Sequence, residues 1–350
     1  MPSPTRRNAL RMGTVAAGVL ATGSAPSAIA AVSKHKAAGA VDVHAHYVTP
    51  TYRQALIAAG QGRPDGMPAI PDWSAEQALR FMDANGTAMA MLSISSPGIS
   101  LGGAAANRYL ARTVNDEGAA IVKANPNRFG LLASVPLPDV SAAVAEAKYA
   151  LDVLGADGIA LATNYEGTYI GDPTFEPLMT ELHRRETVVH LHPTSPACWE
   201  ATSLGYPRPM LEFLFDTTRA VTELALNRVL DRYPGIRFII PHTGASLPVV
   251  ADRIAAFALS SGGAPVDVLG ALRRLHYDVA GFALPRSLPA LLNLVSPDRL
   301  LYGSDYPFTN SALAFAQAKA LEATRALKPA DKQAMFHGNA GRLFPRLRNL

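Results

Sequence analysis

The most informative stretch of the chain is Val41–Val48, which reads Val-Asp-Val-His-Ala-His-Tyr-Val. Its β-branched, apolar character predicts a buried strand, along which successive side chains point to opposite faces. Asp42, His44 and His46 should therefore share one face, opposite the two valines and the alanine. Two imidazoles so spaced can bind one cation, but they can equally be hydrogen-bonded core residues. The remainder of the chain has to distinguish these alternatives.

Seven further apolar runs follow, each bounded by turn residues: Met89–Ser95, Phe129–Pro136, Gly158–Thr163, Thr187–Pro193, Ile236–His242, Leu275–Gly281 and Leu300–Pro307. Segments with helical periodicity alternate with them: Ser74–Asn85, Ala104–Asn125, Ser141–Leu154, Pro173–Arg185, Met210–Tyr233, Leu247–Ser260, Val266–Arg274, Pro285–Val295, Ser311–Leu327 and Pro329–Leu343. Eight strands alternating with helices predict an α/β fold, a single (β/α)8 TIM barrel spanning 41–350. An open doubly wound sheet is the alternative, but no strand is followed by Gly-x-Gly-x-x-Gly.

The N-terminus predicts an export signal over residues 1–30. Arg6-Arg7 opens a basic segment, an Ala/Gly-rich apolar stretch follows from Met12, and Ala28-Ile29-Ala30 offers small residues for cleavage. This order is typical of a twin-arginine signal, so we expect a periplasmic or secreted protein. The apolar run is too short to span a bilayer, and no span is expected in the mature chain. Residues 31–40 read as a linker.

The composition excludes some classes of partner. Without residues 1–30 the chain has 29 basic and 28 acidic residues, so nothing favours nucleic-acid binding. Cys198 is the single cysteine, and no internal disulfide can form. It could be a nucleophile, but a lone thiol in a Pro/Trp-rich loop is more often incidental.

Active sites of TIM barrels lie at the C-terminal ends of the strands, and here these ends carry histidines. The first strand ends in His44 and His46, the fifth in His192 and the sixth in His242, while the eighth ends in Asp305. Imidazole and carboxylate ligands suit zinc, manganese or similar divalent ions. We therefore predict a metal site of His44, His46, His192 and Asp305, with His242 beside it as a proton-transfer group.

Several longer motifs resemble the amidohydrolase superfamily over nearly the whole chain after the signal. They are Val41-Asp-Val-His-Ala-His46, Val189-His-Leu-His-Pro193, Pro241-His-Thr-Gly-Ala-Ser-Leu-Pro248, Tyr302-Gly-Ser-Asp-Tyr-Pro-Phe308 and Gly338-Asn-Ala-Gly-Arg-Leu-Phe344. The branch that is most similar contains aminocarboxymuconate-semialdehyde decarboxylase and the nonoxidative salicylate-type decarboxylases. The stretches Ala156-Asp-Gly-Ile159, Thr163-Asn-Tyr165 and Leu211–Ala220 resemble 6-methylsalicylate decarboxylase homologues in particular.

The resemblance implies the same four ligands, with His242 as the acid/base. Binuclear members bridge two metals with a carbamylated lysine of the fourth strand, and Gly158–Tyr165 has no lysine. One divalent ion is therefore expected, zinc in the first place and manganese in the second. Arg253 resembles an arginine that binds a substrate carboxylate across a dimer interface, so we expect a homodimer. A second such arginine is missing, which weakens any dicarboxylate substrate.

Other candidate substrate-binding residues have alternative interpretations. His190 could contact the substrate or be a hydrogen-bonded residue behind the ligands. Trp199 and Tyr206 lie in the stretch Thr194–Pro209, which is either a pocket wall or ordinary loop packing. Asp278 on the seventh strand should face inward and support the ligands.

Two enzyme functions and one binding function remain in competition. The leading one is a metal-dependent nonoxidative decarboxylase of an aromatic or unsaturated carboxylic acid, such as a salicylate-type acid, in which Asp305 or His242 delivers a proton. The alternative is a metal-dependent hydrolase of an amide or lactone. A ligand-binding barrel without turnover is disfavoured because a proton-transfer histidine accompanies a complete ligand set.

Overall fold

The computed structural model describes residues 39–260 and 265–349. The chain divides into two units, Met1–Ser33 and Lys34–Leu350, and everything described lies in the second. The predicted export signal and residues 31–38 of the predicted linker lie outside the described residues. In the part of the chain that is described, no helix is long and apolar enough to cross a membrane.

Eight parallel strands form one sheet in which each strand pairs with the next along the chain. These strands are β1 (Ala40–His46), β2 (Thr87–Ser93), β3 (Phe129–Ser134), β4 (Gly158–Ala162), β7 (Val188–His192), β8 (Arg237–Ile240), β9 (His276–Asp278) and β10 (Leu300–Leu301). A short antiparallel hairpin, β5 (Asn164–Tyr165) and β6 (Thr168–Tyr169), follows β4. All eight predicted strands are present.

The first and last strands meet, which closes the sheet into a barrel. The Val43 N–H donates to the Tyr302 carbonyl at 2.9 Å, and the Asp305 N–H donates to the His44 carbonyl at 2.8 Å. An open doubly wound sheet would leave these strands at opposite edges. The predicted (β/α)8 barrel is therefore confirmed.

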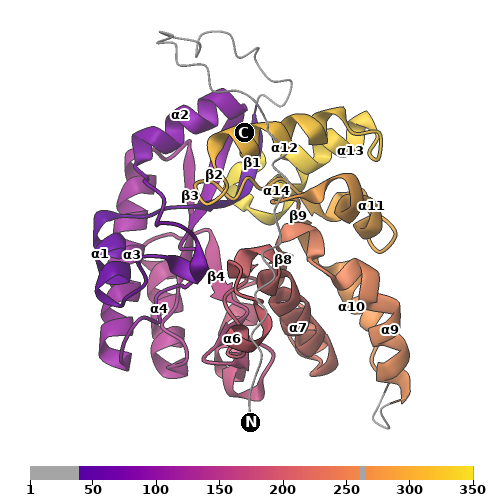
Figure 1. Ribbon diagram of the computed structural model, residues 1–350, viewed down its shortest axis with the longest axis horizontal. Coiled ribbons are helices and arrows are strands. Elements are labelled where there is room, and N and C mark those ends of the chain that lie inside the picture. The colour runs from indigo at the N-terminus through magenta and orange to yellow at the C-terminus, as the bar shows by residue number, and fades with distance from the viewer. Residues whose placement is uncertain (1–38, 261–264, 350) are drawn as a thin grey trace, which may run out of the picture. The chain divides into compact units, whose positions relative to one another are not determined.

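Helices surround the strands (Figure 1). Their bounds are α1 (Pro50–Ala58), α2 (Ala75–Asn85), α3 (Ala104–Ala124), α4 (Val140–Asp152), α5 (Glu176–Arg184), α6 (Trp199–Thr202), α7 (Glu212–Leu226), α8 (Val229–Arg232), α9 (Leu247–Ser260), α10 (Val268–Arg274), α11 (Leu288–Leu291), α12 (Ser311–Ala323), α13 (Pro329–Gln333) and α14 (Asn339–Leu343). Helix α2 begins at a side-chain cap, because the Ser74 hydroxyl accepts a hydrogen bond from the Gln77 N–H at 3.2 Å.

Two predicted helices are wrong in extent. The segment predicted as one helix over Met210–Tyr233 is split into α7 and α8, because Arg228 has a φ of 54° that no continuous helix can include. The segment predicted over Pro285–Val295 is regular only in the short helix α11. Helix α1 has only weak apolar periodicity and was not predicted, although Thr49 caps its first turn.

The strand β1 departs from the simple alternation predicted for it. Val41 and Val43 belong to an apolar cluster to which β2, β3, β4, β7, β8 and β10 also contribute, so they face the barrel interior. Ala45 instead packs into the outer core between strands and helices. A register shift against β2 between Asp42 and Ala45 explains the change of face. The prediction that Val41, Val43 and Ala45 share one face is thus wrong. The register shift allows His44 and His46 to point into the barrel above the two valines.

Candidate metal centre and active-site cavity

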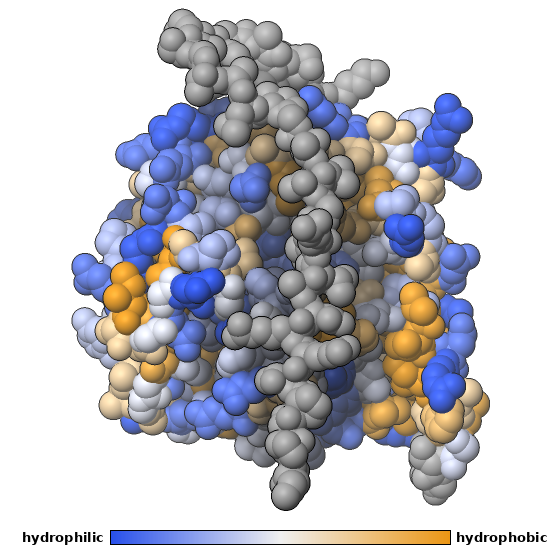
Figure 2. Space-filling model, in the orientation of Figure 1, coloured by the Kyte–Doolittle hydropathy of each residue, from blue (hydrophilic) through white to orange (hydrophobic). Residues whose placement is uncertain are grey.

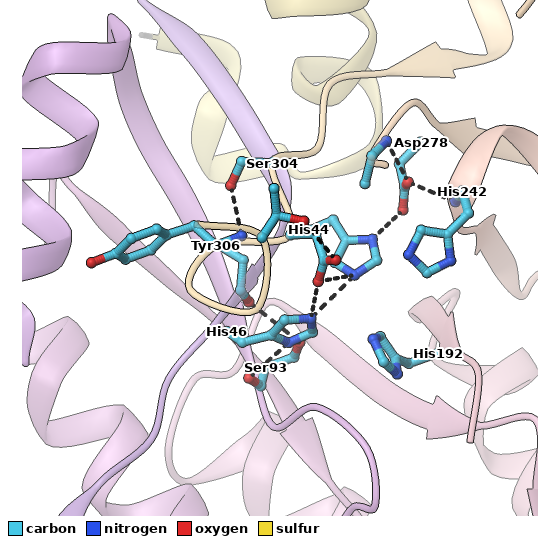
Figure 3. A network of polar contacts seen from close by, with 12 residues as sticks. His44, His46, Ser93, His192, His242, Asp278, Ser304 and Tyr306 are labelled. Atoms are coloured by element: carbon cyan, nitrogen blue, oxygen red, sulfur yellow. Dashed lines mark hydrogen bonds and ion pairs between the residues drawn. The ribbon is translucent and has the colours of Figure 1, made fainter. Parts of the chain in front are cut away.

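The structure brings the four predicted ligands together. His44 and His46 lie at the end of β1, His192 ends β7, and Asp305 follows β10. One ligand atom from each residue lies within 4.8 Å of all the others. Figure 3 shows the rings of His44, His46 and His192 around one common space. Residues far apart in the sequence thus converge because parallel strands end at the same rim of the barrel.

The spacing of the ligand atoms fits a single ion. His44 Nε2 lies 3.1 Å from His46 Nε2 and 3.6 Å from Asp305 Oδ1, and His46 Nε2 lies 3.2 Å from that oxygen. Ligand atoms that surround one tetrahedral zinc at about 2.1 Å stand roughly 3.4 Å apart. The three distances scatter about this value.

The histidine tautomers implied by the hydrogen bonds also fit a bound cation. Each histidine directs its Nδ1 at an acceptor: His44 at Asp278 Oδ2 (2.9 Å), His46 at the Ser93 carbonyl (3.3 Å) and His192 at the Pro193 carbonyl (2.8 Å). A nitrogen facing such an acceptor carries the proton, which leaves a lone pair on every Nε2. Three lone pairs and a carboxylate therefore face one another without a proton between them. That donor set fits a bound divalent ion.

Burial keeps the imidazoles in the form that binds metals. It lowers the pKa of His44 to about 4, although Asp278 acts in the opposite direction. It also lowers the pKa of His192, and the neighbouring histidines add to this effect. For Asp305 burial raises the pKa, but His46 and His44 outweigh it and bring the pKa to about 2. At neutral pH, His44 and His192 are therefore neutral imidazoles and Asp305 is an ionised carboxylate.

Asp278, at the end of β9, connects the ligands to their surroundings. Its Oδ2 accepts hydrogen bonds from His44 Nδ1 at 2.9 Å and His190 Nε2 at 3.0 Å, and its Oδ1 accepts one from the His242 N–H at 3.0 Å. The side chain is fully buried, as the inward orientation predicted from the sequence requires. His190 is equally buried and does not line the cavity. It contacts Asp278 behind the ligands, which agrees with a hydrogen-bonded residue that supports them.

His242 stands beside the ligand cluster. Its ring centroid lies 5.1 Å from that of His44 and 6.2 Å from that of His192, and its side chain lines the cavity. Nδ1 of His242 is buried and has no hydrogen-bond partner among the described residues. The backbone of both His242 and Asp305 is left-handed, with φ of 53° and 58°. Such strain concentrates at functional sites, where the surrounding structure holds it in place.

A cavity of about 630 Å³ opens above the ligands. Its walls are mostly apolar, with Met67, Met210, Phe213, Leu214, Phe282, Phe308 and Leu313 among the lining residues. Phe308 meets the His46 ring edge-on at 5.5 Å, and Phe213 meets the His192 ring in the same way at 6.2 Å. None of the described residues that line this cavity is a lysine or an arginine. The site therefore suits a flat apolar ligand whose charge is met at the metal centre.

The remaining predicted residues lie away from this cavity. Trp199 lines a neighbouring cavity of about 330 Å³, where the Arg208 guanidinium covers its ring at 4.1 Å. Tyr206 is 56% exposed, and Arg253 lies over the Phe257 ring on α9. Neither of these two residues lines either cavity of this chain. The structure thus does not bring Tyr206 or Arg253 to the metal centre.

Sequence reasoning missed Asp65, which lines both cavities. Its local signal is Arg63-Pro64-Asp65-Gly66, a turn sequence with no helix or strand around it. Turn chemistry predicts the bend, but it does not predict that the bend enters the active-site wall. The cavity-lining rings of Phe213 and Phe308 were also missed, although both lie in motifs noted in the sequence.

Comparison with known proteins places the chain in a family. Residues 41–346 match the family model described as Amidohydrolase. The chain is 33% identical over 323 residues to decarboxylase yanB of Aspergillus niger, covering 87% of each chain. It is 34% identical over 318 residues to a 6-methylsalicylic acid decarboxylase of Penicillium expansum, covering 89% of this chain and 97% of that one.

Solved structures agree with this result. A crystal structure of an amidohydrolase II is 38% identical and superposes with a TM-score of 0.84, covering 87% of this chain and 99% of that one. The resemblance inferred from the motifs is confirmed. The chain belongs to the amidohydrolase family.

Proposed function

We propose that this protein is a metal-dependent, nonoxidative decarboxylase of an aromatic carboxylic acid of the salicylate type. The proposal rests on one observation: four residues that can bind a single ion lie at the floor of an apolar cavity. None of the described residues lining that cavity is a lysine or an arginine. The named activity of the relatives, decarboxylation, supports it. Sequence identities of 33% and 34% to these relatives support the class of reaction more strongly than the particular substrate.

The cavity selects for a single aromatic ring with one carboxylate. A volume of about 630 Å³ is ample for a substituted benzoate, and the edges of Phe213 and Phe308 suit the faces of a flat ring. A second carboxylate would enter an apolar wall without a cation among the described lining residues, which is costly. We therefore favour 6-methylsalicylate and similar monocarboxylic acids over dicarboxylates.

The residues of the site can support a decarboxylation, in which a proton replaces the carbon dioxide that leaves the ring. His44, His46, His192 and Asp305 would hold a divalent ion, which would supply positive charge for the substrate carboxylate and for a neighbouring hydroxyl. The bond between the ring carbon and the carboxylate breaks, carbon dioxide leaves, and a proton must reach that carbon. His242 is better placed than Asp305 to deliver it. Asp305 Oδ1 faces the ligand histidines and its Oδ2 accepts from the Thr309 hydroxyl, whereas Nδ1 of His242 has no described partner.

The metal is proposed to be one divalent ion per chain. Zinc is the first choice for three imidazoles and a carboxylate, and manganese is the second. Strand β4 reads Gly-Ile-Ala-Leu-Ala and offers no lysine for a carbamate bridge to a second ion. A single divalent ion is enough to neutralise the charge of one substrate carboxylate.

The test compares decarboxylation with hydrolysis on one metal-analysed sample. Metal-loaded protein is given salicylate, 6-methylsalicylate and related hydroxybenzoates, and carbon dioxide release is measured. Esters and amides of the same acids are given in parallel. We expect carbon dioxide from at least one free acid and no cleavage of the esters or amides. Hydrolysis without carbon dioxide release would replace the proposal by the hydrolase alternative.

We also propose that the protein is a homodimer that uses α9. Val249 and Phe257, which lie on the same side of this helix, are 79% and 60% exposed and form an apolar strip around Arg253. Figure 2 shows apolar surface in the region of α9. A second copy would cover such a strip and lie close to Arg253. Light scattering after size exclusion should give twice the mass of one chain. The variant Phe257→Glu should shift the mass toward that of one chain, and an unchanged dimer would place the interface elsewhere.

A further inference from the structure

The cavity above the metal centre and the neighbouring cavity of about 330 Å³ share a wall. Asp65, Ser95, Ser96 and His192 line both of them. His192 is one of the four ligands, so a substrate that is bound at the metal centre lies beside this wall. A substituent on the far edge of its ring would be directed either at apolar side chains or at the shared wall.

Asp65 provides the charge on that wall. Apart from Asp305 at the metal centre, it is the only Asp, Glu, Lys or Arg among the described residues lining the larger cavity. The residue is only 4% exposed. Its φ of 51° lies in the left-handed region, which is uncommon for a residue other than glycine. A strained turn therefore holds a buried carboxylate beside the substrate cavity.

Contacts from a distant segment fix this carboxylate. The Ser195 hydroxyl donates a hydrogen bond to Asp65 Oδ1, and Arg208 Nε donates one to the Ser195 oxygen at 3.0 Å. The Arg208 guanidinium lies 4.1 Å above the Trp199 ring. A Cβ on Gly66 would come within 2.9 Å of Arg208 Nη1, so the two segments are in close contact. Asp65 is thus held in place from outside the cavity.

A fixed carboxylate on a cavity wall discriminates among ring substituents. It accepts a hydrogen bond from a hydroxyl, gains nothing from a methyl group, and repels a second carboxylate. We infer that Asp65 determines substrate specificity by accepting a hydrogen bond from a ring hydroxyl other than the one beside the reacting carboxylate. This inference rests on the proposed function for the identity of the ring, but it concerns binding and not turnover.

A purely structural role for Asp65 makes a different prediction. If the contacts to Ser195 and Arg208 merely kept the loop in place, loss of Asp65 would weaken every ligand by a similar factor. A recognition role changes the ratio between two ligands that differ only in the group at the wall. The ratio is therefore the quantity to measure.

The experiment uses pairs of 2-hydroxybenzoates that carry either a hydroxyl or a methyl group at the same ring position, namely position 3, 4 or 5. Dissociation constants for the metal-loaded protein are measured by calorimetry, and carbon dioxide release is followed separately. At one ring position the wild type should prefer the hydroxyl by about 10- to 100-fold, the range for a hydrogen bond to a charged acceptor. Asp65→Ala should abolish that preference, and Asp65→Asn, which keeps the size and one acceptor, should reduce it.

Two further variants complete the test. Ser195→Ala should weaken the preference partially, because Arg208 would no longer fix Asp65 through the hydroxyl. Asp72→Ala is the matched control, because this aspartate is 90% exposed in its ion pair with Arg53, and it should keep the preference. A preference that persists in both Asp65 variants overturns the inference, as does its absence at every ring position. If the protein prefers the hydroxyl over the methyl group but releases no carbon dioxide from any acid, the proposed function is overturned while the inference about Asp65 stands.

Discussion

Asp278 Oδ2 accepts a hydrogen bond from His44 Nδ1 at 2.9 Å, and this contact determines which nitrogen of His44 is free to bind a metal. Asp278 is buried, which by itself would raise its pKa, but electrostatic attraction and hydrogen bonds from His44 and His190 outweigh burial and hold the pKa well below the usual range. It is therefore ionised at neutral pH and can only accept. Carboxylates in this position orient a histidine ligand and raise its basicity.

Replacement of Asp278 by Asn should weaken metal binding. The amide can donate to His44 Nδ1, which would favour the tautomer with the proton on Nε2 and so block the ligand. We expect a 10- to 100-fold loss of metal affinity, the usual range for such supporting residues, measured by competition with a chelator. Asp83→Asn, at a largely exposed position on α2, is the matched control and should retain wild-type affinity.

The ligand set predicts about one divalent ion per chain. His44→Ala and His192→Ala should each lose metal and activity together, because three remaining ligands with one open position bind a divalent ion less tightly. Elemental analysis of dialysed protein measures the stoichiometry. Two tightly held ions per wild-type chain would contradict a mononuclear centre and would favour the hydrolase alternative.

His242 should affect turnover and not metal content. Because it stands beside the ligand cluster, His242→Ala should retain the ion while losing about 10²- to 10⁴-fold in rate, the usual contribution of a general acid or base. Metal content and rate must be measured on the same preparation. Depleted metal would make His242 a ligand, and full occupancy with an unchanged rate would remove it from the mechanism.

Export remains a prediction from the sequence, since residues 1–30 lie outside the described part of the chain. Arg6→Lys with Arg7→Lys should leave the protein in the cytoplasm if the twin-arginine route carries it. Cell fractionation with an antibody against the barrel measures the distribution. Uncleaved wild-type protein in the cytoplasm would contradict the prediction.

The barrel and the ligand set could be predicted because both follow from local patterns. Each strand is a short apolar run, and the rule that barrel strands end at one rim brings His44, His46, His192 and Asp305 together without any distance information. The same rule correctly placed Asp278 behind them. Strand ends are thus the positions where sequence reasoning about this fold is most reliable.

The cavity walls could not be predicted because they depend on contacts between distant loops. Asp65 enters the wall through its contact with Ser195, and no periodicity couples those two turns. Trp199 and Tyr206 both lie between β7 and α7, yet Tyr206 is exposed whereas the Trp199 ring is covered by Arg208. The register shift in β1 likewise depends on its pairing with β2, which the strand's own sequence does not reveal.

The junction between β1 and β10 has a consequence for how the molecule is made. His44 and His46 belong to the first strand to leave the ribosome, whereas Asp305 follows the last, and the Asp305 N–H bonds directly to the His44 carbonyl. A nascent chain that stops before Asp305 has all three imidazoles and Tyr302, whose carbonyl accepts from Val43, but it lacks the fourth ligand and the hydrogen bond from Asp305 to His44. The complete set of four ligands therefore exists only once residue 305 has been added, so we expect the ion to be bound after synthesis of the barrel and not during it.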